Sequence, residues 1–459
     1  MSVGSFAADP AFPQLEIATD PALMKRTFQT HLRPVDGKNY DIEDCRFIRL
    51  RYRQDSRRFL LYTLRLLEPD TGLERDVQVT GIIYAQKNKA EQTWRELKAT
   101  DPQQEIPDGW LTFEPVSFVP ELDMLVQVFP YDRRLPTLPL VMAGPPPELE
   151  PVLVGRFGEG EWRVQSWNVQ PVRYREQGGA VLRYTAKARN AATGRTTEKS
   201  FYAKVYRHEK GEQTYQALRA LWRRTSANGE GFTVVRPLAY LSEHRALILE
   251  EAPGTPLDQI LLGKSDPTAA VRRVAQALAA FNQGDVPAMT RRHLLADQVA
   301  VMERARKLLG WACPHLREEV DSIIEGVSAG LEDVPLRPTH RDLKPDHIFV
   351  DGERTIFIDL DSLARADPVL DPAYLLARLA AMPAVLPVPP EQTRRAAREF
   401  AEEYFSHVPE AWQERLPFHY AGTLLEVAHG FFRRQLPDWP DRIATLLEEA
   451  RASLAGRLW

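Results

Sequence analysis

Two aspartates in the segment THRDLKPDHIFVDGERTIFIDLDSLARADP, residues 339–368, have a spacing that could support chemistry. Asp342 lies in a predicted loop, and Asp359 follows a predicted hairpin whose turn is Asp351-Gly352. One carboxylate can accept the proton of a hydroxyl group while another holds a divalent cation on phosphate oxygens, as transfer of a γ-phosphoryl group requires. A lysine must also reach the phosphates from a strand, and Lys204 in SFYAKVYR has a suitable place. Together these residues predict phosphoryl transfer.

Each of these residues also has a purely structural interpretation. Lys204 alternates with Tyr202 and Tyr206 on one strand face, where a lysine is often a solvated edge residue. Asp359 could simply flank a turn, and Glu212 could belong to an ordinary helix surface. The occurrence of all of them in this order along the chain favours the chemical interpretation.

The segment HRDLKPDHIFVDGERTIFIDLD resembles the catalytic and metal loops of the protein-kinase-like fold. DPVLDPAYLLARL, further along, resembles the aminoglycoside phosphotransferase and choline kinase branch of that fold, in which an Asp-Pro and a further aspartate open a helix. The resemblance extends from about residue 170 to about residue 450. It implies an α+β, bilobal protein-kinase-like fold, with a small antiparallel β lobe and a helical lobe.

The resemblance implies a role for each matching residue. Asp342 would be the catalytic base, and Lys344 would add positive charge near the transferring phosphoryl group. Asp359 would bind Mg²⁺ on ATP, and Asp371 would brace the catalytic loop. The nucleotide site would comprise Lys204 for the phosphates, Glu212 that orients Lys204, Gly178 and Gly179 at the turn between the first two strands, and backbone groups of the hinge from Glu250 to Ala252 for adenine.

His347 departs from the family pattern, which has a metal-binding asparagine five residues after the catalytic aspartate. Mg²⁺ prefers hard oxygen ligands, so an imidazole is a poor substitute for a carboxamide oxygen. Three interpretations keep His347 at the metal: a bridging water, a weakened metal site, or a softer ion such as Mn²⁺. In a fourth, His347 only packs or hydrogen-bonds within the loop.

Two stretches of the chain resemble each other at an offset of 122 residues, beginning at Arg51 and Arg173. The register holds for Tyr62-Thr63 against Tyr184-Thr185 and returns at Pro115 against Pro237 after a one-residue deletion. We interpret this as a duplicated module. The first copy has Ile82 in place of Lys204 and no catalytic loop behind it, so we expect a degenerate small-lobe-like cap that covers the cleft, shapes the acceptor pocket or mediates assembly.

Proline clusters and changes of periodicity divide the chain into four predicted parts. Residues 1–140 form the cap and residues 141–160 a proline-rich linker, where few helices or strands are expected because proline removes amide donors. Residues 161–260 form a kinase-like small lobe of strands and one helix. Residues 261–459 form a helical lobe that is interrupted by the hairpin and carries the catalytic and metal loops.

Composition bounds the class of protein. The chain has 459 residues, 27% charged and 44% hydrophobic, which predicts a globular protein of two or three units. A net charge of −4 argues against a dedicated nucleic-acid partner, which needs a concentrated positive field. Cys45 and Cys313 show no metal-ligand spacing, and no stretch has the length and apolarity of a membrane span. We therefore expect a cytoplasmic protein without a membrane partner; its oligomeric state is left open.

The acceptor of the phosphoryl group is predicted from a short spacing. Between Asp359 and Asp371 only eleven residues intervene, too few for the peptide-docking segment of protein kinases. A small-molecule acceptor is therefore favoured over a protein. We expect a sugar or an amino sugar, although the sequence does not decide between an amino sugar or choline and a neutral sugar. Two alternatives stay open. One is a pseudokinase-like binding or regulatory protein, in which His347 reflects lost catalysis. The other is a protein kinase, supported only by the motif His-Arg-Asp-Leu-Lys-Pro.

Overall fold

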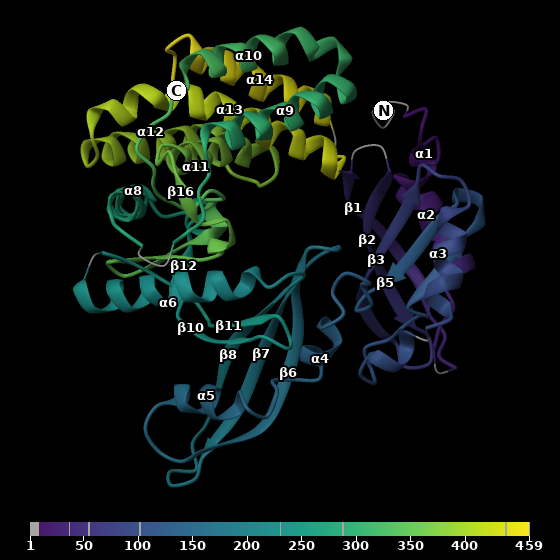
Figure 1. Ribbon diagram of the computed structural model, residues 1–459. Coiled ribbons are helices and arrows are strands. Elements are labelled where there is room, and N and C mark those ends of the chain that lie inside the picture. The colour runs from purple at the N-terminus through teal and green to yellow at the C-terminus, as the bar shows by residue number, and fades with distance from the viewer. Residues whose placement is uncertain are drawn as a thin grey trace. The chain divides into compact units, whose positions relative to one another are not determined.

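The computed structural model describes residues 9–35, 37–53, 56–100, 102–229, 231–286, 289–436 and 438–458, and these form two compact units (Figure 1). The first unit comprises residues up to Gly211, with Leu238–Leu249 and a short segment from Arg433. The second comprises Glu212–Pro237, Glu250–Phe432 and the residues from Asp438. Antiparallel sheets dominate the first unit and helices the second, as the predicted α+β class requires.

The first sheet of the first unit has five antiparallel strands in the order β1-β2-β3-β5-β4. Buried and exposed residues do not alternate regularly along its two long hairpin strands, β2 and β3, because both faces of these strands are buried over much of their length. Gly72, with a φ of 68°, makes the turn between them, since L side chains rarely adopt that conformation. The elements are α1 (Leu15–Ala18), α2 (Pro21–His31), β1 (Asp41–Arg53), β2 (Arg57–Glu68), β3 (Leu73–Tyr84), α3 (Lys89–Lys98), β4 (Val116–Val119) and β5 (Met124–Val128), with 3₁₀ helices η1 (Pro102–Glu105) and η2 (Pro120–Leu122).

The second sheet of the first unit has the order β6-β7-β8-β11-β10. The predicted turn NAATG joins β7 to β8. Asn190 stabilises it by accepting hydrogen bonds from the backbone N–H groups of Ala192 and Thr193 at 3.1 and 2.9 Å, and Gly194 supplies a φ of 71°. The strands are β6 (Trp162–Arg175), β7 (Gly179–Asn190), β8 (Thr196–Tyr206), β10 (Pro237–Leu241) and β11 (Ala246–Glu250), and α6 (Lys210–Asn228) follows β8 in the chain.

The two sheets pair in the same register at the offset of 122 residues. Ile82 lies opposite Phe59, and Lys204 lies opposite Val181. A register shift occurs between Ile42 and Asp44 in the first sheet and at the corresponding place in the second, between Val164 and Ser166. The duplication remains our interpretation, and equal strand order and register support it.

The proline-rich segment between the sheets is packed and partly helical. It contains α4 (Leu138–Met142), α5 (Glu150–Val154) and the 3₁₀ helix η3 (Gly155–Phe157). The expectation of few helices there was wrong, because proline occupies the first turn of each α-helix, where its missing N–H costs no hydrogen bond. Leu138, Val141 and Leu153 are fully buried in the core of the second sheet, which also includes Leu61 of the first.

The second unit is mainly helical and carries the catalytic hairpin. α9, α10, α13 and α14 stack side by side (Figure 1), with Gly326 of α10 against Leu454 of α14 and Gly422 of α13 against Met302 of α9. The α-helices are α7 (Leu257–Leu262), α8 (Thr268–Gln283), α9 (Leu295–Ala312), α10 (Arg317–Gly330), α11 (Leu370–Ala381), α12 (Pro390–Ser406), α13 (Glu410–Arg434) and α14 (Trp439–Leu454).

Short strands and 3₁₀ helices complete the second unit. One small sheet has the order β12-β14-β15-β9, and β13 pairs with β16. Gly352, with a φ of 56°, makes the predicted turn of the β14–β15 hairpin. The elements are β9 (Phe232–Val234), β12 (Thr255–Pro256), η4 (Pro314–Leu316), β13 (Arg337–Thr339), η5 (Pro345–His347), β14 (Ile348–Asp351), β15 (Arg354–Phe357), η6 (Leu360–Ser362), β16 (Ala364–Ala366) and η7 (Met382–Ala384).

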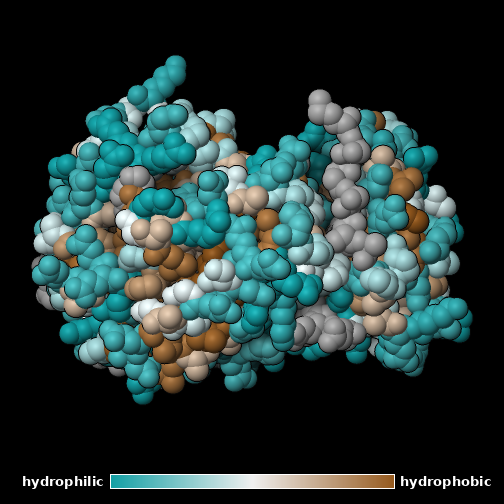
Figure 2. Space-filling model, turned by 90° about the horizontal axis from the view of Figure 1, so that it is seen from above, coloured by the Kyte–Doolittle hydropathy of each residue, from teal (hydrophilic) through white to brown (hydrophobic). Residues whose placement is uncertain are grey.

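The face of the molecule drawn in Figure 2 is largely polar. On the face drawn in Figure 2, hydrophilic residues cover most of the area, and hydrophobic residues form small separate groups. Over the described part of the chain, no helix combines the length and the apolarity needed to cross a lipid bilayer.

Candidate active site

Asp371 fixes the loop that carries Asp342. It is fully buried at the start of α11, and its Oδ2 accepts hydrogen bonds from the backbone N–H of His340 at 2.8 Å and from Asn282 at 2.9 Å. Its Oδ1 accepts from the backbone N–H of Arg341 at 2.8 Å. Arg341 has a φ of 65°, a conformation that a non-glycine residue keeps only when its surroundings hold it. Asp371 therefore braces the loop, as the resemblance implied.

The catalytic loop and the metal loop are locked to each other. The side chain of His340 lies 2.9 Å from the carbonyl oxygen of Ile358, and the N–H of Ile358 donates to the carbonyl of His347 at 3.0 Å. Asp359, the next residue, also has a positive φ, 60°. These contacts set the position of Asp359 relative to the loop of Asp342.

Asp342 is kept ionised by a neighbouring cation. Lys344 donates a hydrogen bond to Asp342 Oδ2 at 2.8 Å. Burial alone would raise the pKa of the Asp342 carboxyl, but the charge and hydrogen bond of Lys344 lower it below its ordinary value. An ionised carboxylate is the form that can accept a hydroxyl proton.

The tautomer of His347 follows from the hydrogen bond that its ring makes at Nδ1. Nδ1 lies 3.0 Å from the backbone carbonyl oxygen of Asp342, and because a carbonyl only accepts, Nδ1 must carry the proton. Nε2 therefore has a lone pair; it is buried, has no hydrogen-bond partner among the described residues, and lies 3.5 Å from Asp359 Oδ2. Burial and Lys344 lower the pKa of His347 to about 4, so at neutral pH the ring is uncharged and the 3.5 Å contact is no ion pair.

A buried lone pair facing a carboxylate fits a cation between them. Ligand atoms of Asp342, His347 and Asp359 all lie within 4.8 Å of one another. A metal-binding imidazole commonly donates its other N–H to a carbonyl, as His347 does here. His347 and Asp359 thus fit a divalent cation that accepts one nitrogen and carboxylate oxygens, with Asp342 beside them. This donor set suits Mn²⁺ more than Mg²⁺.

The residues expected to hold the nucleotide lie partly in each unit. In the first unit, Lys204 pairs with Val181 across β7 and β8, and its ammonium lies 5.8 Å from the centre of the Tyr206 ring. Gly178 lies in the β6–β7 turn, and Gly179 is the first residue of β7. In the second unit, Glu212 is exposed in the first turn of α6, Glu250 ends β11, and Ala252 lies in the irregular segment after it. Their nucleotide roles stay predictions.

The match to a family model agrees with this geometry. Residues 180–418, more than half of the chain, match the model of the phosphotransferase enzyme family. The chain belongs to that family. It is a small-molecule phosphotransferase with a kinase-like fold. A comparison with curated proteins finds no match.

Solved structures with a similar fold share little sequence with this phosphotransferase. A choline/ethanolamine kinase family protein from Mesorhizobium loti is 14% identical, with a TM-score of 0.43, and the match covers 69% of this chain and 92% of that one. An ethanolamine kinase from Plasmodium vivax is 12% identical (TM-score 0.41; 64% and 84% covered). The GDP and kanamycin complex of APH(2″)-IIIa is 14% identical (TM-score 0.41; 63% and 94% covered).

The sequence analysis of this phosphotransferase did not predict a seam of polar contacts that joins α11 and the segment before it to α13. Asp367 lies 2.8 Å from His419 Nε2 and accepts from Arg415 at 2.9 Å; Tyr374 donates to Glu426. Both Asp367–His419 and Tyr374–Glu426 are 52 residues apart, so the helices run parallel in fixed register. Asp367 precedes α11 and lies seven residues before Tyr374, and His419 lies seven residues before Glu426 on α13. Residues seven apart in a helix share one face, which is the signal the sequence offered.

The Tyr374–Glu426 pair lies within electrostatic range of Asp342. Burial raises the pKa of the Tyr374 hydroxyl and of the Glu426 carboxyl, and the charge of Asp342 acts in the same direction on both. Arg378, one turn after Tyr374, lowers the pKa values of Glu426 and Asp342. The charges of Asp342 and Arg378 therefore both act on the Glu426 carboxyl.

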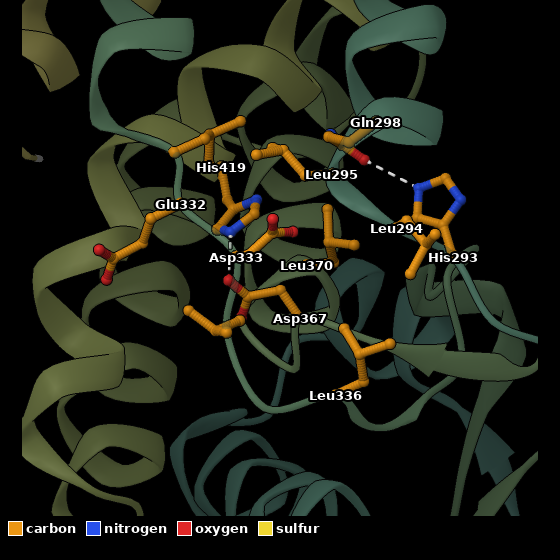
Figure 3. Close-up of a pocket in the computed structure, with 12 residues that line it drawn as sticks. His293, Leu294, Leu295, Gln298, Glu332, Asp333, Leu336, Asp367, Leu370 and His419 are labelled. Atoms are coloured by element: carbon orange, nitrogen blue, oxygen red, sulfur yellow. Dashed lines mark hydrogen bonds and ion pairs between the residues drawn. The ribbon is translucent and has the colours of Figure 1, made fainter.

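The other end of the seam borders a small pocket (Figure 3). His419 and Asp367 lie next to each other in its lining, and His293, whose Nε2 lies 3.2 Å from Gln298 Oε1, lies on another side. The free volume is about 20 Å³, room for about one water molecule. The pocket is too small for a sugar ring and is not itself an acceptor site in this structure.

Proposed function

We propose that this phosphotransferase transfers the γ-phosphoryl group of ATP, with a divalent cation, to a hydroxyl of a small molecule, a sugar or an amino sugar. The observation that carries the proposal is the buried lone pair of His347 Nε2 next to Asp359, beside an Asp342 kept ionised by Lys344. This arrangement contains a base for the acceptor and ligands for a cation in adjoining positions.

Each residue has a defined task in the proposed reaction. Asp342 orients the acceptor hydroxyl and takes its proton, and Lys344 offers positive charge to the transferring group. Asp359 and His347 would hold the cation, whose charge would neutralise the phosphate oxygens. Lys204, oriented by Glu212, would bind the other phosphates; Gly178 and Gly179 would cover them, and the backbone from Glu250 to Ala252 would meet adenine.

The acceptor class rests on two features. Only eleven residues separate Asp359 from Asp371, so no long segment is available to dock a peptide. Tyr374, Arg378 and Glu426 supply hydroxyl, guanidinium and carboxylate groups near Asp342, and such groups hydrogen-bond the hydroxyls of a sugar. These features support a hydroxyl-rich acceptor over a protein.

Nucleotide binding and transfer can be tested separately. Thermal unfolding of the wild type with ATP and Mn²⁺, ATP and Mg²⁺, or ATP and chelator should show a metal-dependent rise in midpoint, because a ligand of the folded state stabilises it by about 2.7 kcal/mol at 100 times its Kd. Asp359→Asn should lose the rise. Asp342→Asn should keep it but lose transfer of labelled phosphate to a panel of neutral and amino sugars.

The metal role of His347 has its own test. His347→Asn restores the residue usual in the family, so the preference for Mn²⁺ over Mg²⁺ should shift toward Mg²⁺. His347→Ala should weaken the binding of both ions. An unchanged metal preference in His347→Asn would contradict a ligand role. No metal-dependent rise in the wild type and no product from any panel member would instead favour the binding or regulatory protein.

A further inference from the structure

The β6–β7 turn lies where a phosphate-covering loop is expected, and its conformation is tightly constrained. Gln177 has a φ of 54°, which costs a non-glycine residue on the order of 1 kcal/mol. The N–H of Gly178 donates to the carbonyl of Arg175 at 2.8 Å. A Cβ on Gly179 would lie 2.8 Å from the carbonyl oxygen of Val205, so no larger residue fits there without a shift. Such a turn needs outside contacts to persist.

Asp132, from residues 1–140, supplies one of these contacts. Its Oδ2 accepts from the backbone N–H of Gln177 at 2.7 Å and from the hydroxyl of Tyr174 at 2.9 Å. Only 3% of Asp132 is exposed, and burial raises the pKa of its carboxyl. A buried acidic group is expensive, and here it bonds directly to the strained residue of the turn.

Two arginines of β1 supply further contacts to the turn. Glu176 is only 1% exposed, and its Oε2 accepts hydrogen bonds from Arg49 Nε at 3.0 Å and from Arg49 Nη2. Arg51 donates to the backbone carbonyl of Glu176 at 3.1 Å. Removing Arg49 would leave a buried carboxylate without this partner, which is strongly unfavourable.

Three polar side chains from one module thus converge on two consecutive residues of a four-residue turn. A merely cohesive interface would rely on apolar packing, which the shared core with Leu61 already provides. We propose that the N-terminal module positions the β6–β7 turn for the nucleotide phosphates, with Arg49 and Asp132 as positioning residues. This inference rests on the proposed function. A turn held in advance spares the nucleotide the free-energy cost of ordering it.

The test compares ligands with and without phosphates on the full chain. Kd values for ATP with Mn²⁺ and for adenosine are measured by titration calorimetry for the wild type, Asp132→Asn and Arg49→Gln. Arg49→Gln/Glu176→Gln removes the pair without leaving a buried charge and serves if Arg49→Gln does not fold. Arg46→Gln is the matched control, since Arg46 also lies on β1 and pairs with Asp76 at 2.6 Å, but in an exposed position.

The expected result is a rise of about tenfold in the Kd for ATP, equivalent to about 1.4 kcal/mol, with adenosine within about twofold of wild type and the control unchanged. An unchanged Kd for ATP in Asp132→Asn and in the double variant would overturn the inference. An equal loss for ATP and adenosine would also overturn it, by showing a general structural role. If the wild type bound no ATP, the proposed function itself would fail, an outcome seen before any variant is compared.

Discussion

Ile82 and Lys204 occupy the same place in two sheets of equal strand order and register. Ile82 is 2% exposed, between Phe59 and Leu125 of an apolar cluster, whereas Lys204 is half-buried with its ammonium near the ring of Tyr206. The first sheet shows that this architecture folds with an apolar residue at the position. The lysine of the second sheet is therefore not required for the fold, which favours a chemical role for it.

The largest effect should come from making the second sheet like the first at this position. Lys204→Ile should lower phosphoryl transfer by about 10²–10³-fold, because a charge that meets the phosphates is lost, while the unfolding midpoint changes little. The control is Lys199→Ile, at an exposed lysine of the same strand. Steady-state kinetics with the acceptor found in the sugar panel measures the effect. If Lys204→Ile kept the kcat/KM of the wild type, Lys204 would have no role in phosphoryl transfer.

The reverse substitution should disrupt the first sheet instead. Ile82→Lys would bury an ammonium group among Phe59 and Leu125, and an uncompensated buried charge costs about 3–5 kcal/mol. Urea unfolding measures the loss, with Ile82→Met as the control of similar size. A cost below about 1 kcal/mol would mean that the first sheet tolerates the cation and that the contrast between the sheets is weaker than the structure indicates.

The duplication, which remains our interpretation, could be inferred from the sequence because pairs such as Tyr62 and Tyr184 stay in register without any tertiary information. The sequence also predicted Asp342, His347 and Asp359 as neighbours, since one short hairpin brings them together. It missed Asp132 with Gln177 and Tyr374 with Glu426, because these contacts join residues 45 and 52 positions apart. A spacing of seven residues places Tyr374 with Asp367, and Glu426 with His419, on one face each, but which residue pairs with which depends on packing.

Equivalent tyrosines should make equal contributions in the two sheets. Tyr62 donates to the carbonyl of Ala18 at 2.5 Å, and Tyr184 donates to that of Val141 at 2.6 Å; both are fully buried. Tyr62→Phe and Tyr184→Phe should each cost about 1–2 kcal/mol at pH 8, since each leaves a buried carbonyl unsatisfied. Urea unfolding measures both, and a difference above about 1 kcal/mol would argue against equivalent surroundings.

Alkaline pH sharpens the same comparison. Burial raises the pKa of both hydroxyls above the ordinary value of 10. The unfolded tyrosine ionises first, because its pKa is lower than that of the folded one. The stability that each buried hydroxyl contributes is therefore fully present below pH 10 and is lost as the pH rises toward the folded-state pKa. The advantage of the wild type over each Phe variant should therefore shrink between pH 10 and 11, and a constant difference would contradict the burial of the hydroxyls.

The smallest effect concerns the turn glycines, Gly72 and Gly194, which are also 122 positions apart and have φ values of 68° and 71°. Gly72→Ala and Gly194→Ala should each cost about 1 kcal/mol, because a Cβ is unfavourable at positive φ even where space is open, as it is at Gly72. Gly155→Ala is the control: a Cβ added there would have no neighbouring atom within 4 Å, and the φ is −59°, so its cost should be near zero. Because the two turns differ in their side-chain neighbours but not in backbone conformation, equal losses in urea unfolding would show that the repeat extends to the backbone of the turns, and a loss at one site alone would confine it to the strands.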